Sequence, residues 1–163
     1  MPPSLVVSAC LFGRACRYDG ASKPATAVQD LAERWSSAGG AVIPVCPEDL
    51  GGLGTPRPGA HLDGGDGHAV LEGRARVVRA EDGGDVTDAF VAGAVAAAER
   101  ATGAACGVLK ARSPSCGCGQ TTIDGRFQEG DGVFAALLRR RGVQVVTDEA
   151  LGALDVAEFV TKL

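Results

Sequence analysis

The chain has 163 residues, 45% of them hydrophobic, and its 16 Lys and Arg against 20 Asp and Glu give a formal charge of −4. This length fits one domain with a substantial core, and the acidic balance argues against a nucleic-acid-binding surface. Aromatic residues make up only 4% of the chain, which also disfavours a platform for stacking bases. We therefore expect a single domain over residues 1–163 without a nucleic-acid partner.

The N-terminal residues show neither a basic segment nor a long apolar stretch, so we expect no signal peptide. No apolar run approaches the roughly 18 residues that a membrane span needs, so we expect no membrane partner either. These features predict a cytoplasmic protein. In that compartment the six cysteines are not expected to form three structural disulfides, which makes metal binding or thiol chemistry the leading explanation.

The first half of the chain begins with a predicted βαβ unit. Residues 4–10 form an apolar run typical of a buried strand. Residues 26–40 have apolar side chains at helical spacing and end in a glycine pair, and residues 41–46 form the next predicted strand. Residues 47–68, rich in Gly, Pro and Asp, are predicted to be a long loop. Residues 69–80 are predicted to form a small hairpin or two edge strands.

The second half continues the alternation of helices and strands. Helices are predicted over 85–102 and 131–142, and core strands over 104–110 and 143–147, with short helical pieces in 148–163. The pattern predicts an α/β fold, a single Rossmann-like domain with a small, mostly parallel sheet flanked by helices. In such folds ligands bind beyond the carboxyl ends of the strands.

Cysteines follow three of the predicted strands. Cys10 and Cys46 end the first two strands, and Cys116 lies on the loop that leaves the third. Cys16 lies six residues beyond Cys10. Because parallel strands bring their carboxyl ends to one edge of the sheet, we expect these thiols to converge there.

The spacing of the thiols bears on the metal. No paired C-x-x-C motif of a structural zinc site is present, and single cysteines from separate loops fit an iron–sulfur cluster better. If three thiolates bind a cubane cluster, its fourth iron is open and can act as a Lewis acid. Cys106, inside a predicted strand, is interpreted as a small buried side chain. Cys118 is either a spare ligand or a bystander.

Four polar residues near these thiols could carry chemistry. Glu48 follows Cys46 by two residues, and could face a substrate or be a solvated loop acid; Asp19, after Cys16, is similar. Ser113 could donate or accept a proton, and Lys110 could stabilise negative charge. Their alternative interpretations are a turn residue and a solvated charge.

Four motifs, "SACLFGRACRYDG", "PVCPEDLGGLGTPRP", "GDVTDAFVAGA" and "LKARSPSCG", together resemble the thiouracil desulfidase family, over about residues 4 to 150. The resemblance implies a [4Fe-4S] cluster held by three cysteines and the conversion of 2-thiouracil and water to uracil and sulfide without net redox change. It implies that a small-molecule thiolated pyrimidine is the substrate of an enzyme that cleaves a C=S bond.

Carried onto this sequence, the resemblance implies Cys10, Cys46 and Cys116 as cluster ligands, with Cys16 as an alternative third ligand or a non-ligating neighbour. It implies Glu48 as the proton-transfer residue and Ser113 as a residue that positions or protonates the substrate. Asp19 and Lys110 are expected to contact the substrate.

The sequence departs from the family pattern at two positions. His61 stands where an acidic residue is common, which could shift specificity, and Cys118 could close the open iron as a fourth ligand. Three other functions stay open: a sulfur-handling enzyme acting on thiolated RNA, an iron–sulfur redox sensor or carrier, and a zinc-binding structural module. The oligomeric state, monomer or homodimer, is also open.

Overall fold

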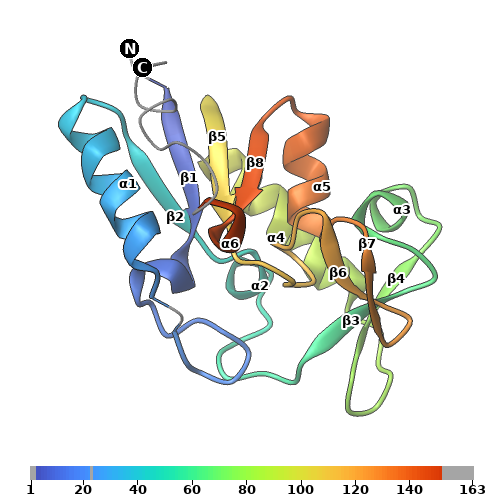
Figure 1. The fold of residues 1–163 in the computed structure, drawn as a ribbon. Coiled ribbons are helices and arrows are strands. Elements are labelled where there is room, and N and C mark those ends of the chain that lie inside the picture. Colours follow the sequence, from blue (N-terminus) through green and yellow to red (C-terminus); the bar gives the residue numbers. More distant parts are fainter. Residues whose placement is uncertain (1–2, 23, 152–163) are drawn as a thin grey trace.

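The computed structural model describes residues 3–22 and 24–151, which form two four-stranded sheets (Figure 1). The first sheet is parallel throughout, in the order β2-β1-β5-β8. Its strands are β1 (Ser4–Ser8), β2 (Val42–Val45), β5 (Ala104–Leu109) and β8 (Gln144–Thr147). The predicted Rossmann-like α/β fold is thereby confirmed.

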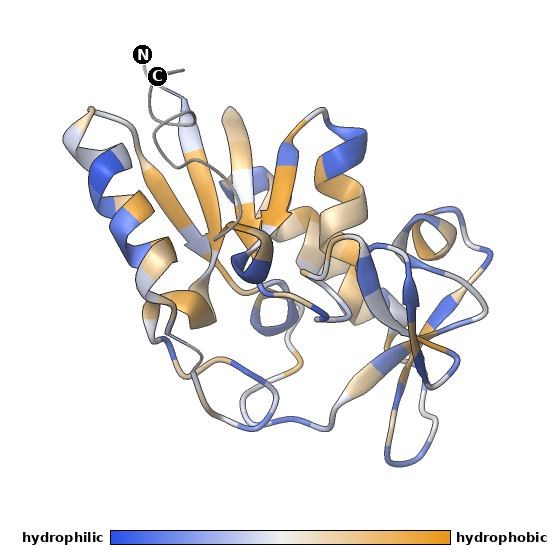
Figure 2. Cartoon of the chain, viewed as in Figure 1, coloured by the Kyte–Doolittle hydropathy of each residue, from blue (hydrophilic) through white to orange (hydrophobic). Residues whose placement is uncertain are grey.

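The strands of this sheet are mostly hydrophobic (Figure 2), and helices cover both of its faces because apolar side chains lie on both. Leu5 and Val7 pack with α1 (Thr26–Ser37) and α6 (Asp148–Leu151) in one core cluster. Val6, which points to the other face, packs in a second cluster with α4 (Thr87–Arg100) and α5 (Val133–Arg140). The predicted helices and core strands all exist, with ends that differ by a few residues. The prediction for 148–163 is met by α6, and its remainder lies outside the described residues.

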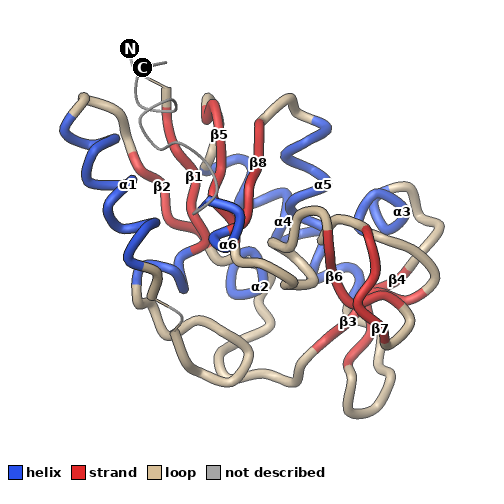
Figure 3. Tube along the Cα trace, in the orientation of Figure 1, coloured by secondary structure: helices blue, strands red, loops and turns tan. Residues whose placement is uncertain are grey.

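The second sheet replaces much of what was predicted as loop and hairpin (Figure 3). Its order is β4-β3-β6-β7, with strands β3 (Ala60–Asp63), β4 (Arg76–Arg79), β6 (Gln120–Ile123) and β7 (Arg126–Glu129). Of the hairpin or two edge strands predicted over 69–80, the hairpin was wrong, because the first part of this segment belongs to helix α3 (Gly67–Leu71) and β4 pairs with β3 instead. One edge strand is found, since β4 lies at the edge of the second sheet. The carboxylate of Asp66 starts that helix by accepting a hydrogen bond from the backbone N–H of Ala69.

Two short helices follow the first two strands. The first strand ends at Ser8 rather than at residue 10, and the 3₁₀ helix η1 (Ala9–Phe12) carries Cys10. Helix α2 (Pro47–Leu50) begins directly after Cys46, with proline in its first turn, where a missing N–H costs nothing. The predicted loop 47–68 therefore contains α2 and β3.

Helix α2 lies against α4 at a very close approach. A Cβ atom placed on Gly93 would lie 1.9 Å from the carbonyl oxygen of Pro47, and one placed on Gly51 would lie 2.2 Å from the carbonyl oxygen of Ala89. Only glycine allows two backbones to come this near. Within the described ranges, no helix is long and apolar enough to cross a membrane.

Candidate functional site

A cavity of about 690 Å³ lies beyond the carboxyl ends of β1, β2 and β5, where the sequence predicts a ligand site. Ser8 and Val45 line it from the ends of β1 and β2, and Lys110 lines it from the residue that follows β5. His61 and Phe127 line it from the second sheet, so the cavity lies between the two sheets. Three of the four segments that resemble the desulfidase family contribute to its wall.

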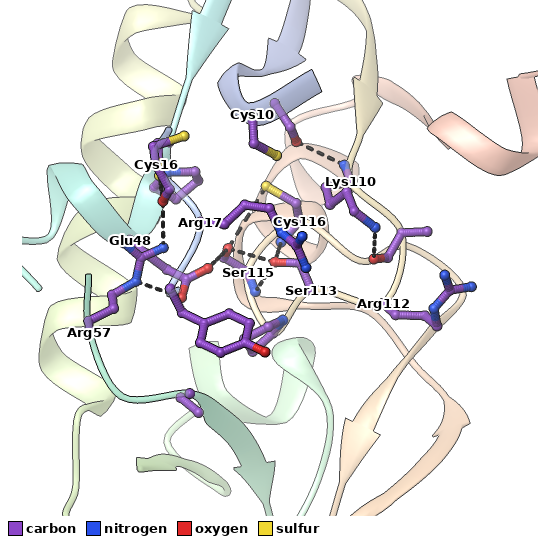
Figure 4. A pocket seen from close by; sticks show the side chains of 18 of the residues that line it. Cys10, Cys16, Arg17, Glu48, Arg57, Lys110, Arg112, Ser113, Ser115 and Cys116 are labelled. Atoms are coloured by element: carbon purple, nitrogen blue, oxygen red, sulfur yellow. Dashed lines mark hydrogen bonds and ion pairs between the residues drawn. The ribbon is translucent and has the colours of Figure 1, made fainter. Parts of the chain in front are cut away.

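Four thiols line this cavity: Cys10, Cys16, Cys46 and Cys116. All are free cysteines, and all but the half-buried Cys46 are buried. The thiol of Cys46 donates to the backbone carbonyl of Cys16 at 3.6 Å, and the thiol of Cys16 interacts with its neighbours Cys10 and Cys46. In Figure 4 the sulfur atoms of Cys10 and Cys116 point into the same space. The predicted convergence of these cysteines is found in the structure.

The surroundings of these thiols disfavour their charged forms. The interaction with the neighbouring thiol of Cys10 is the main cause that raises the pKa of Cys16 to about 11. Burial is the main cause that raises the pKa of Cys116 to about 12. The pKa of Cys46 is also raised, first by its hydrogen bond with Cys16 and then by burial. Without a metal, the three groups are therefore neutral thiols at pH 7.

Glu48 enters the cavity from the first turn of α2 and is held at both carboxylate oxygens. Its Oε1 accepts from Nε of Arg57 at 3.3 Å, and its Oε2 accepts from Oγ of Ser115 at 2.9 Å. The two side chains of the ion pair are only 13% and 5% exposed. Arg57 also donates to the backbone carbonyl of Cys16 at 2.9 Å, so it connects Glu48 to the segment that carries Cys16 (Figure 4).

The loop that carries Cys116 is shaped by Ser113. Its Oγ accepts from the backbone N–H groups of Ser115 and Cys116 at 3.2 and 3.1 Å, a turn typical of serine. The hydroxyls of Ser113 and Ser115 lie 3.1 Å apart. Because the single hydroxyl proton of Ser115 is donated to Glu48, Ser113 is the donor in that pair. A directed chain of hydrogen bonds thus runs from Ser113 through Ser115 to Glu48.

The other predicted site residues divide between the cavity and the surface. Lys110 lines the cavity and its Nζ donates to the carbonyl of Ala111 at 3.1 Å, and His61 lines the cavity from β3. Asp19 is exposed, is not part of the cavity wall, and accepts from the backbone N–H of Ala21 in a local turn. A substrate contact at Asp19 stays a prediction that this placement does not support.

The two remaining cysteines do not line the cavity. Cys118 lies near Arg139 and Asp131, and burial is the main cause that raises its pKa. Cys106 is buried in β5, as interpreted from the sequence, and burial alone raises its pKa to about 11. The described residues contain no group of three His, Cys, Asp or Glu side chains around the position of a single ion. Cysteines that bind a cubane cluster each bind a different iron, so they need not meet at one point.

Sequence reasoning missed Arg57 and Ser115. Arg57 stands in the motif "TPRP" and Ser115 in the motif "SPSC". In the first motif only the proline-rich turn was considered, and in the second only Ser113 and Cys116 were considered. The sequence does contain a signal for Arg57. It stands between two prolines, which restrict the backbone around it, and Glu48 is a nearby acid with which it can pair.

The fold and the site together define a Rossmann-like α/β protein that gathers thiols and one buried carboxylate at the ligand-binding edge of its sheet. The profile of the 2-thiouracil desulfurase family matches residues 5–150, and the chain belongs to this family.

Two known proteins are similar over nearly their whole length. An uncharacterized protein of Bacillus subtilis (strain 168), YbbK, is 38% identical over 152 residues, which are 90% of this chain and 97% of the relative. The solved structure of the [4Fe-4S]-dependent thiouracil desulfidase TudS is 35% identical, with a TM-score of 0.76 and 99% of each chain covered. The resemblance seen in the sequence motifs is confirmed.

Proposed function

We propose that this protein is a [4Fe-4S]-dependent thiouracil desulfidase that converts 2-thiouracil and water to uracil and hydrogen sulfide. A C–O bond forms and a C–S bond breaks at the same ring carbon, so no electrons are gained or lost. The observation that carries the proposal is one cavity that joins four thiols to the Glu48 and Ser115 pair, in a member of the 2-thiouracil desulfurase family.

The thiols of the cavity fit the cluster. We assign Cys10, Cys46 and Cys116 as its ligands, and Cys16 as the alternative third ligand, because all four line the cavity and come from three separate loops. Thiolates are the usual ligands of iron–sulfur clusters, and the raised pKa values mean that ligation displaces protons. When bound, the cluster supplies an iron that attracts the sulfur of the substrate as a Lewis acid. Cys118 lies away from the wall, so the structure gives no support to its closing that iron.

The chain's own residues supply the proton transfers. Ser113 stands at the start of the hydrogen-bond chain and Glu48 at its end, with Ser115 between them. Glu48 and Ser115 both line the cavity, so the Glu48 carboxylate takes a proton from water, directly or through the Ser115 hydroxyl, and returns it to the departing sulfur. The second proton of the water reaches the sulfur when the added hydroxyl becomes the C=O group of uracil, and Ser113 holds the Ser115 hydroxyl in place. Arg57 and Lys110 line the cavity, and their positive charges can stabilise negative charge on the leaving sulfur. A neutral substrate needs no larger basic patch than this.

Anaerobic purification followed by 2-thiouracil addition tests the proposal. We expect a brown protein with an iron–sulfur visible spectrum, loss of the thiouracil absorbance, and release of one sulfide per uracil. Glu48→Gln should keep the iron content and lower kcat by about a hundredfold or more. Asp49→Asn, an exposed neighbour on the same helix, is the matched control and should keep full activity.

Two results would contradict the proposal. A cluster-loaded protein without turnover would favour the redox sensor or carrier, and a colourless zinc protein would favour the structural module. Full activity of Glu48→Gln would overturn the proton-transfer role alone.

A further inference from the structure

Two aromatic side chains differ from the rest of the described surface in being large, apolar and exposed. Among residues 3–22 and 24–151, Tyr18 and Phe127 are the exposed large hydrophobic residues, at 47% and 62%. Both line the cavity that holds the thiols. Single exposed apolar residues are ordinary, but two rings at one cavity indicate a ligand with an apolar face.

The two rings belong to different parts of the fold and are held in different ways. The carbonyl of Tyr18 accepts from the backbone N–H of Arg57 at 2.7 Å, and its ring lies 3.8 Å from where a Cβ on Gly59 would be. Phe127 is opposite Thr122 in the β6–β7 pair, and cross-strand partners share one face of a sheet. Because Thr122 also lines the cavity, this face of the hairpin belongs to the cavity wall.

We propose that Tyr18 and Phe127 bind the flat ring of the substrate by stacking, and thereby select planar heteroaromatic thioamides over non-planar or aliphatic ones. This inference rests on the proposed function and adds the residues that recognise the ring rather than the sulfur. Every pyrimidine presents a π face to an aromatic side chain, whatever its ring substituents. The guanidinium of Arg17, 6.0 Å from the centre of the Tyr18 ring, also lines the cavity.

Kinetics with two substrates test the inference. In the cluster-loaded enzyme, Tyr18→Ala and Phe127→Ala should each raise KM for 2-thiouracil roughly five- to a hundredfold. The effect on kcat should be smaller, because stacking is the same in the ground state and the transition state. Because KM for 2-thiouracil rises, the preference for 2-thiouracil over thioacetamide, measured as the ratio of their kcat/KM values, should fall in both variants. Tyr18→Phe keeps the ring and should keep KM. Arg126→Ala is the matched control, since this exposed neighbour of Phe127 is not part of the wall.

Direct observation of Tyr18 makes the test independent of turnover. Tyr18 is the only tyrosine of the chain, so incorporation of 3-fluorotyrosine gives one ¹⁹F signal. We expect addition of uracil to shift this signal saturably in the cluster-loaded protein. A saturable shift without desulfuration would support the ring site while overturning the proposed function.

The opposite results would overturn the inference. An unshifted signal together with unchanged KM values in both alanine variants means that the rings do not touch substrate. Self-association that is lost in these variants, with KM unchanged, would assign the rings to an interface between two copies of the chain.

Discussion

Replacement of Arg57 by methionine tests how far the site depends on one buried cation. Methionine keeps much of the apolar stem but removes the guanidinium that donates to Glu48 and to the carbonyls of Cys16 and Gly54. The Glu48 carboxylate would then remain in a pocket where its side chain is 13% exposed, without its positive partner. A charge left in this way has neither full hydration nor compensation.

The size of the effect follows from the burial of the pair. Removal of one partner of a buried ion pair costs about 3–5 kcal/mol, far more than at the surface. For a domain of this size, that corresponds to a loss of about 6–20 °C in Tm. Arg57→Lys keeps the charge but not the planar fork of donors, so its loss should be intermediate.

Thermal unfolding of the three proteins, compared in the same cluster state, gives the measurement. The control is Arg74→Met, because Arg74 pairs with Glu72 at the surface with its side chain 66% exposed, and we expect no measurable change there. If Arg57→Met lost no more stability than Arg74→Met, the reasoning that the pair is buried and mutually dependent would be refuted.

Three further predictions concern Ser115 and three of the cysteines. Ser115→Ala should lower kcat by about a hundredfold with little change in KM, and an unchanged kcat would remove Ser115 from the proton route. Cys116→Ala should lose most of the bound iron while Cys118→Ala retains it, as iron per chain would show; the reverse pattern would contradict the ligand assignment. Burial raises the pKa of Cys106 from 9.0 to about 11, so the folded state keeps a proton that the unfolded state loses in this range. Stability is therefore expected to fall between about pH 9 and pH 11, and urea unfolding of Cys106→Ala should show a weaker decline.

The parallel sheet and the meeting of its cysteines could be predicted because they depend on strong, local signals. Apolar runs at Leu5–Val7 and around Val108 mark strands, and the carboxyl ends of parallel strands meet whatever the loops do. The positions of Cys46 and Cys116 in the cavity follow from that rule alone.

The second sheet could not be predicted in the same way. Its strands are short, and β3 pairs with β6 through one register pair, Leu62 with Ile123, far apart in the chain. Such pairing depends on tertiary packing rather than on local sequence preference. The turn at Asp124 and Gly125, both with positive φ, did offer a hairpin signal that joins β6 to β7.

The partners of Glu48 were hidden for a related reason. Glu48 itself stands out beside Cys46, but its hydrogen bonds come from Arg57 and Ser115, which reach it only after the chain has folded. Sequence motifs name the residues that are present, while burial and contact decide which of them interact.

The close approach of α2 to α4 makes the proposed reaction depend on Gly93, which does not line the cavity. Gly93 has no side chain, and this allows the helix that carries Glu48 to come down onto α4. An alanine at position 93 would displace α2, and Glu48 would move with this helix relative to Cys10 and Cys116, even if the protein still folded. The placement of Glu48 therefore depends partly on Gly93, a residue in the middle of α4 that lies against the backbone of α2.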